Sequence, residues 1–152
     1  MIRRTLLAIA ASVLTLGWVG AAPSAQATDY SACDGVWVIV DFGSLPGGVQ
    51  VQCATEFSTG TVALRTAGKA GFDPTLSDGF VERIAGKPTK SDPTKAYWSY
   101  WHASRKSDGS YGSWSYSNDG SNAYHPKKGD AEGWHYVSLS EKASGPGKTP
   151  AV

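Results

Sequence analysis

The chain has 152 residues, of which 41% are hydrophobic, 11% aromatic and 18% charged, and its formal net charge is +1 at pH 7. This near-neutral balance, with no stripe of Lys and Arg, excludes the electrostatic footprint of a nucleic-acid-binding protein. The length suffices for one hydrophobic core, so we expect one domain.

The N-terminus has the features of a secretory signal peptide. Two arginines precede an apolar run from Leu6 to Val19, and Ala25-Gln26-Ala27 is an A-x-A cleavage pattern. An uncleaved anchor is the alternative, but the run is shorter than the roughly 20 residues that span a bilayer. We therefore expect residues 1–27 to be removed and the mature chain to be secreted, extracellular and without a membrane span. Cleavage removes two of the 14 basic residues and none of the 13 acidic ones, which leaves a formal charge of −1.

A β-hairpin is predicted at the start of the mature chain. Residues 36–42 are β-branched and aromatic, residues 49–53 alternate apolar with polar, and a Gly/Pro-rich turn joins them. Cys33 and Cys53 then lie at the open end of the hairpin. A metal-binding or redox pair is the alternative, but the spacing fits neither a zinc pattern nor C-x-x-C. Export places the two cysteines where disulfides persist, so we expect a structural bond.

One helix is predicted over residues 57–71. Ser58 is a candidate N-cap, and Gly71 suits a glycine C-cap. Gly60 and Gly68 weaken the helix, so we expect it to depend on packing against a sheet.

Four further strands are predicted, the first over residues 79–84. The other three, residues 97–103, 113–117 and 132–137, share a pair of aromatic residues two positions apart, which are Trp98 and Tyr100, Trp114 and Tyr116, and Trp134 and Tyr136. Because strand side chains alternate between faces, each pair points to one side, and a shared sheet would gather up to six rings on one surface. These rings either fill the core or stack on a ligand, and both interpretations stay open.

The segment from residue 138 to residue 152 is rich in Ser, Gly, Pro and Lys and has no apolar period. We expect it to be a disordered tail that follows a β-rich domain at residues 28–137.

No catalytic constellation stands out. The three histidines, His102, His125 and His135, lack zinc-site spacing, and no G-x-S-x-G elbow occurs. Asp130 and Glu132 would point the same way on a strand, a spacing that by itself identifies no acid/base pair. We therefore expect no enzyme activity, catalytic residue, metal or cofactor; a hydrolase would need a catalytic pair that the sequence does not show.

Four segments in order resemble the C-terminal domain of transcobalamin and intrinsic factor, especially its stand-alone secreted forms in high-GC Gram-positive bacteria. The segments are Gly79 to Pro88, Tyr97-Trp98-Ser99-Tyr100, Tyr111 to Tyr116, and Lys128 to Trp134. The resemblance covers most of residues 35–137, and the Tyr-Trp strand and the last Gly-Asp-x-x-x-Trp strand are its most specific parts.

The resemblance implies an α+β, β-grasp-like fold with mostly antiparallel sheet packed on a single helix. It also implies a ligand-facing surface, and with Trp101 of the same strand the candidate ligand-binding residues are Trp98, Tyr100, Trp101, Gly112, Trp114 and Tyr116. Two departures limit the transfer of function. The chain lacks the large helical domain that forms the other half of the cobalamin site, and residues 118–125 lengthen the loop before the last strand.

We therefore expect a secreted, non-enzymatic binding module for a corrinoid or another planar small molecule, with a cell-surface protein as a second kind of partner. The alternative is a cell-envelope or carbohydrate-contacting module, because aromatic rings on a sheet also stack on sugar rings.

Overall fold

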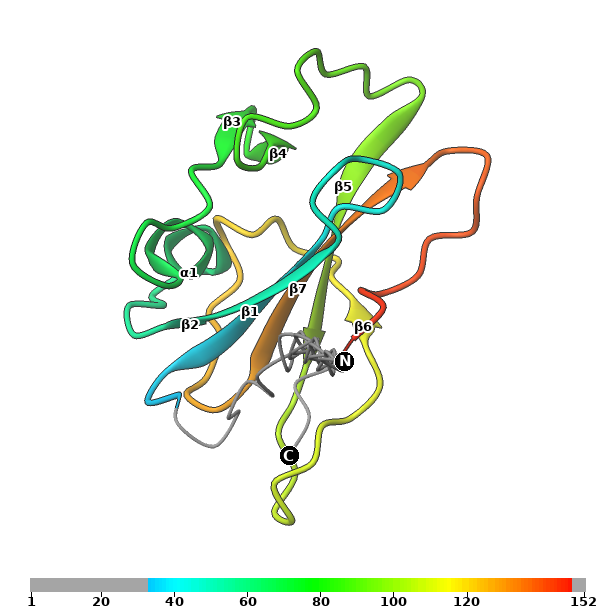
Figure 1. Ribbon diagram of the computed structural model, residues 1–152. Coiled ribbons are helices and arrows are strands. Elements are labelled where there is room, and N and C mark those ends of the chain that lie inside the picture. Colours follow the sequence, from blue (N-terminus) through cyan, green and yellow to red (C-terminus); the bar gives the residue numbers. More distant parts are fainter. Residues whose placement is uncertain (1–32, 149–152) are drawn as a thin grey trace, which may run out of the picture.

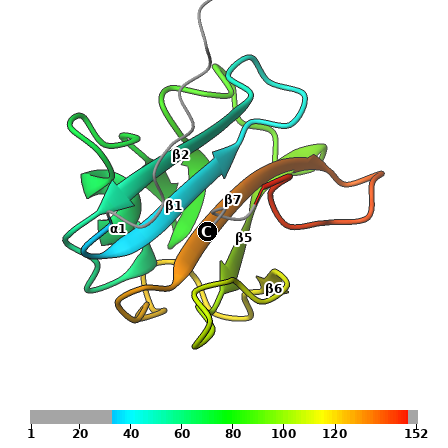
Figure 2. The same cartoon turned by 60° about the horizontal axis from the view of Figure 1, so that its bottom comes forward.

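The computed structural model describes residues 33–148, so the predicted signal peptide lies outside the described residues. A five-stranded sheet has the order β2 (Val49–Ala54), β1 (Val36–Asp41), β7 (Ala131–Ser138), β5 (Ala96–Ala103) and β6 (Ser115–Tyr116) (Figure 1). In Figure 2, the first four of these strands lie side by side in that order. The remaining elements are helix α1 (Gly60–Thr66) and a two-stranded sheet of β3 (Thr75–Ser77) and β4 (Phe80–Arg83).

All strand pairs are antiparallel except β1 with β7, which pair in parallel at the middle of the sheet. Within residues 33–148, the predicted α+β class with mostly antiparallel sheet and one helix is therefore confirmed. No helix in residues 33–148 is long and apolar enough to cross a membrane.

The predicted hairpin and disulfide are confirmed. β1 and β2 pair along their full lengths, and Trp37 lies opposite Cys53. Cys33 and Cys53 are bonded, with their Cα atoms 5.5 Å apart, across the open end of the hairpin. The bond ties the segment before β1 to the end of β2.

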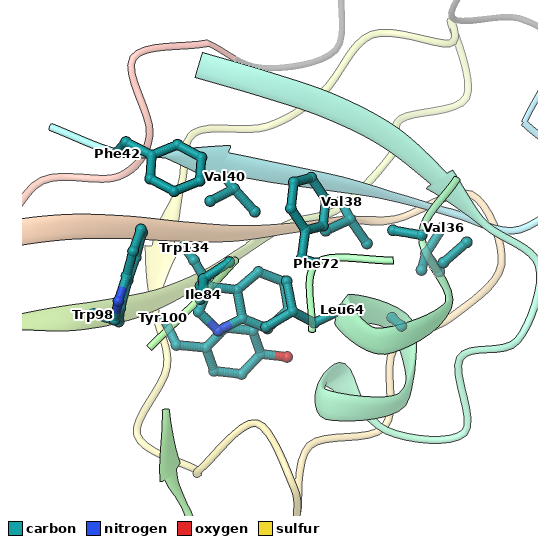
Figure 3. Close-up of a cluster of buried hydrophobic side chains, with 13 residues drawn as sticks. Val36, Val38, Val40, Phe42, Leu64, Phe72, Ile84, Trp98, Tyr100 and Trp134 are labelled. Carbon is teal, nitrogen blue, oxygen red and sulfur yellow. The ribbon is translucent and has the colours of Figure 1, made fainter. Parts of the chain in front are cut away.

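The main core lies between the sheet and α1 (Figure 3). Alternate residues of β1, β5 and β7 point to this side, and they meet the apolar face of α1 and the residues that follow it. The larger members of this cluster are Val36, Val38, Val40, Phe42, Leu64, Phe72, Ile84, Trp98, Tyr100 and Trp134. The opposite face of the sheet carries a smaller cluster, built on Trp37, Ile39, Ala103 and Ala131.

The helix is shorter than the predicted 57–71. Thr59, not Ser58, is the N-cap, and its side chain accepts a bond from the Val62 amide at 3.2 Å. After Thr66 the backbone becomes extended at Ala67 and left-handed at Gly68. Gly68, one of the two glycines predicted to weaken the helix, therefore follows its end. The Gly68 amide donates to the Cys53 carbonyl of β2 rather than to a carbonyl of the helix.

Two strand predictions change in extent. The sequence analysis missed β3, because three residues are too few to show a period. The predicted strand 113–117 is reduced to the two residues of β6. Trp114 packs against Gly133 and Gly145, while the Ser117 amide still donates to the Tyr100 carbonyl of β5 at 2.9 Å.

The C-terminal segment differs from the predicted disordered tail as far as residue 148. It leaves the end of β7 and returns to the side of β6 (Figure 1). Pro146 is buried over Gly133 and Trp114, and a Cβ on Gly133 would lie 2.8 Å from the Pro146 ring. The Gly147 amide donates to Asp41 at 2.8 Å, and His135 Nδ1 is 2.9 Å from the Ser144 carbonyl. The missing side chain at Gly133 leaves the hollow that Pro146 fills.

The disulfide should contribute stability because it closes a loop across a sequence separation of 20 residues. We expect Cys53→Ser to lower the free energy of unfolding by about 2–5 kcal/mol. Urea denaturation of the oxidised wild type and of the variant measures this difference. Equal midpoints would contradict a structural role for the bond.

Pro146 should also contribute, although it belongs to a segment whose composition predicts disorder. We expect Pro146→Ala to lower the free energy of unfolding by about 1–2 kcal/mol, because two buried methylenes are lost and the unfolded chain gains freedom. Lys148→Ala, at an exposed position two residues on, serves as the matched control in thermal denaturation. A Pro146→Ala variant as stable as this control would show that the segment does not dock.

Candidate functional site

A hollow of about 500 Å³ lies between β5, the β3–β4 hairpin and the loop of residues 117–122. Five aromatic side chains line it, which are Phe80, Tyr97, Trp98, Tyr100 and Tyr116. A second hollow of about 290 Å³ shares Phe80, Tyr97 and Trp98 with the first and extends toward Pro93 and Ala96. We call the two hollows together the aromatic groove.

The rings of the aromatic groove fall into two groups. Trp98 and Tyr100 form the floor and are 6% and 8% exposed, whereas Phe80 and Tyr116 on the walls are 74% and 48% exposed. Apart from Leu139, these two are the only large hydrophobic side chains of residues 33–148 that are exposed. Exposed rings that meet in one hollow indicate a contact surface.

The floor belongs to the core. The Trp98 indole packs edge-on against Phe42 and Tyr136, with ring centroids 5.4 Å and 5.2 Å away. Its Nε1–H donates to the Lys87 carbonyl at 3.2 Å. The position of Trp98 is therefore set by β1, β7 and the segment after β4.

Two residues of β7 fix the position of Tyr100. Its ring stacks on Trp134 at 4.8 Å, and its hydroxyl donates to the Glu132 carboxyl. Gly60 makes this position available, because a Cβ there would lie 2.2 Å from the Tyr100 oxygen. The glycine that weakens α1 is thus required by the floor of the groove.

The 117–122 wall is anchored to the start of α1. The Thr61 amide donates to the Ser121 carbonyl at 2.8 Å, and the hydroxyls of the two residues are 2.9 Å apart. The Gly60 amide donates to the Tyr124 carbonyl at 3.1 Å. The lengthened loop therefore satisfies amides at the helix N-terminus that have no partner within the helix.

The structure brings three of the predicted ligand-binding residues, Trp98, Tyr100 and Tyr116, to the aromatic groove. Trp101 lies on the other face of the sheet. It is the β5 partner of Tyr116 and packs edge-on against that ring, with the ring centroids 5.1 Å apart. Trp114 packs under the C-terminal segment. Gly112 lies outside the groove and bonds to the Ser104 carbonyl at 3.0 Å.

The expected surface of six rings is divided between the two faces of the sheet. Trp98, Tyr100, Trp134 and Tyr136 gather on the side of α1. Trp114 packs with the cluster on the other side, and Tyr116 lies opposite Trp101. The alternation rule held within each strand, but Trp114 and Tyr116 lie on the opposite face from the ring pairs of β5 and β7, and Tyr116 lines the first hollow from β6, the edge strand of the sheet.

The sequence analysis missed Phe80, Asp78 and Asp119 as groove residues. Phe80 alternates with Val81 in a predicted strand, and only Val81 packs on the core, so the outward position of Phe80 could have been inferred from the pattern. The two aspartates come from loops whose positions depend on tertiary contacts.

Outside the groove, Glu132 is fully buried beside Tyr100 and directly opposite His102. Burial raises the pKa of Glu132 to about 8, with a smaller contribution from Asp130, while the Tyr100 hydrogen bond acts in the opposite direction. Burial lowers the pKa of His102, against the attraction of Asp119 and Asp130, and its ring stacks on Tyr124 at 3.8 Å. The Glu132 carboxyl is therefore enclosed, whereas His102 and Tyr124 are partly exposed.

No group of three or more His, Cys, Asp or Glu residues within residues 33–148 is arranged to hold a metal ion. Comparison of the chain with protein-family models, curated proteins and solved structures finds no match.

Glu132 should make stability depend on pH. In the unfolded chain its pKa returns to the ordinary value of 4.5, so between about pH 4.5 and 8 the folded state holds a proton that the unfolded state has lost. The free energy of unfolding should therefore fall by about 1.4 kcal/mol per pH unit from this group across that window. Glu132→Gln cannot titrate and should flatten the fall, as measured by denaturation at several pH values. The same slope in both proteins would contradict a buried neutral Glu132.

Proposed function

We propose that this chain is a secreted, non-enzymatic binding module of the transcobalamin C-terminal type, and that it takes a planar small molecule, a corrinoid first among them, in the aromatic groove. The single observation that carries the proposal is the pairing of two exposed rings, Phe80 and Tyr116, with a buried aromatic floor in one hollow. Exposed aromatic rings are unfavourable in water, and a flat apolar ligand that covers them removes this apolar area from solvent and so lowers the free energy.

The order of the elements supports a β-grasp-like fold. A hairpin is followed by a helix and then by five strands, of which β5, β6 and β7 join the hairpin in one mixed sheet whose first strand pairs in parallel with the last. In β-grasp folds the same parallel pair forms the centre of the sheet, and the helix after the hairpin covers one face. Because one fold can host many functions, the groove rather than the fold carries the functional proposal.

The disulfide supports export, because such bonds persist in oxidising compartments. The signal-like N-terminus points the same way.

A second candidate function, carbohydrate contact, is favoured by the polar rim of the same groove. Ser117, Asn118 and Asn122 line it beside the rings. Sugars are bound by such combinations, since their apolar faces stack on aromatic rings while their hydroxyls need hydrogen-bond partners.

Ligand titrations of the mature protein test the proposal. We expect cobinamide or cobalamin to bind, and we expect Phe80→Ala and Tyr116→Ala each to weaken binding by about two- to tenfold, the effect of losing one ring contact. Because both rings are exposed, the melting temperatures should stay within a few degrees of the wild type.

Leu139→Ala is the matched control, because it removes an exposed large side chain outside the groove. It should leave binding unchanged. Binding of oligosaccharides with the same response to the two ring variants would support the second candidate instead. If neither class of ligand binds, or if the control weakens binding as much as the ring variants, the groove is not the site.

A further inference from the structure

The charged side chains that line the aromatic groove all have one sign. Asp78 and Asp119 line the first hollow, and Asp78 and Glu82 line the second. Among residues 33–148, no Lys, Arg or His side chain lines either hollow. This is a local bias, because the whole chain carries 14 basic and 13 acidic residues.

These carboxylates are not neutralised within residues 33–148. The ion pairs of that part of the chain join Lys95 to Asp92 and Lys128 to Asp34, so neither includes Asp78, Glu82 or Asp119, although Asp92 and Lys95 are chain neighbours of residues that line the second hollow. A concave surface with low-dielectric walls concentrates the potential of such charges at its mouth. The groove therefore attracts positive charge before any ligand is bound.

Asp78 and Phe80 lie at the junction of the two hollows, because both residues line both of them. Phe80 is 74% exposed, so a face of its ring is open to a ligand. An organic cation near this junction would meet a carboxylate and an aromatic ring together, and aromatic faces attract ammonium and guanidinium groups. The junction thus offers two independent sources of attraction for the same charge.

We propose that the aromatic groove selects a small organic cation, an ammonium or guanidinium group carried on a flat apolar body, with the charge beside Asp78 and Phe80 and the apolar body on Trp98 and Tyr116. This inference rests on the proposed function in that the aromatic groove binds a planar small molecule, and it names a cationic ligand class in place of a corrinoid.

NMR titration of the mature protein with three one-ring probes tests the inference. Benzyltrimethylammonium, benzyl alcohol and benzenesulfonate share a ring and differ in charge. We expect the cation to bind at least about fivefold more tightly than the neutral probe and the anion to bind most weakly, with shifts at the amides of Phe80 and Trp98. Raising the salt from about 0.01 M to about 1 M shortens the Debye length from about 30 Å to about 3 Å and should weaken only the cation.

Asp78→Asn should weaken the cation by about two- to fivefold and leave benzyl alcohol unchanged. The left-handed backbone of Asp78, with φ of 49°, is well tolerated by Asn, so the substitution removes charge without straining the turn. Glu141→Gln removes the same charge at an exposed position outside the groove and is the matched control.

Two results would overturn the inference. If the neutral probe binds as tightly as the cation, or if Glu141→Gln weakens the cation as much as Asp78→Asn, the groove does not select charge, although it remains a binding site. If no probe of any charge shifts the groove amides, the inference fails, whereas the proposed function fails only if corrinoids and oligosaccharides do not bind either.

Discussion

The parallel pairing of β1 with β7 is the contact on which the rest of the structure depends. These strands lie far apart in the sequence, yet Val40 lies beside Trp134 and both are fully buried. Their pairing brings the two ends of the domain together. The elements α1, β3–β4 and β5 all belong to the chain that connects these two strands. Strands joined by long connections lose much entropy on pairing, and the two-sided burial of β1 and β7 offsets this loss.

The same core supplies the floor of the aromatic groove but not the wall that carries Phe80. Trp98 and Tyr100 of β5 pack on residues of β1 and β7, whereas Phe80 belongs to a two-stranded sheet that pairs only with itself. Two strands alone are marginally stable in water, so β3–β4 depends on what it touches. A rigid floor with a separately attached wall suits a site that must adapt to its ligand while the fold is kept.

Sequence reasoning reached the elements whose signals are local. The hairpin, the disulfide, β5 and β7 follow from alternation, turn residues and cysteine position, and they are confirmed. Helix length and the docked segment around Pro146 were predicted wrongly because each is decided by a distant partner, whereas β3 was missed because three residues are too few to show a period. Gly68 bonds to β2, and Pro146 fills a hollow above Gly133. Three of the six predicted ligand-binding residues line the groove, because the spacing of the rings along a strand can be read from the sequence. The face of the sheet on which the rings of residues 114–116 lie depends on tertiary contacts and could not be read in this way.

Native-state hydrogen exchange tests the central claim most directly, namely that the groove combines a floor within the cooperative core and a wall outside it. The account predicts that the Ser99 amide of β5, opposite His135, exchanges only through global unfolding. The amides of β4 should exchange through a smaller opening, with a lower free energy and a weaker dependence on denaturant. Equal protection of β4 and β5, with the same denaturant dependence, would contradict the account.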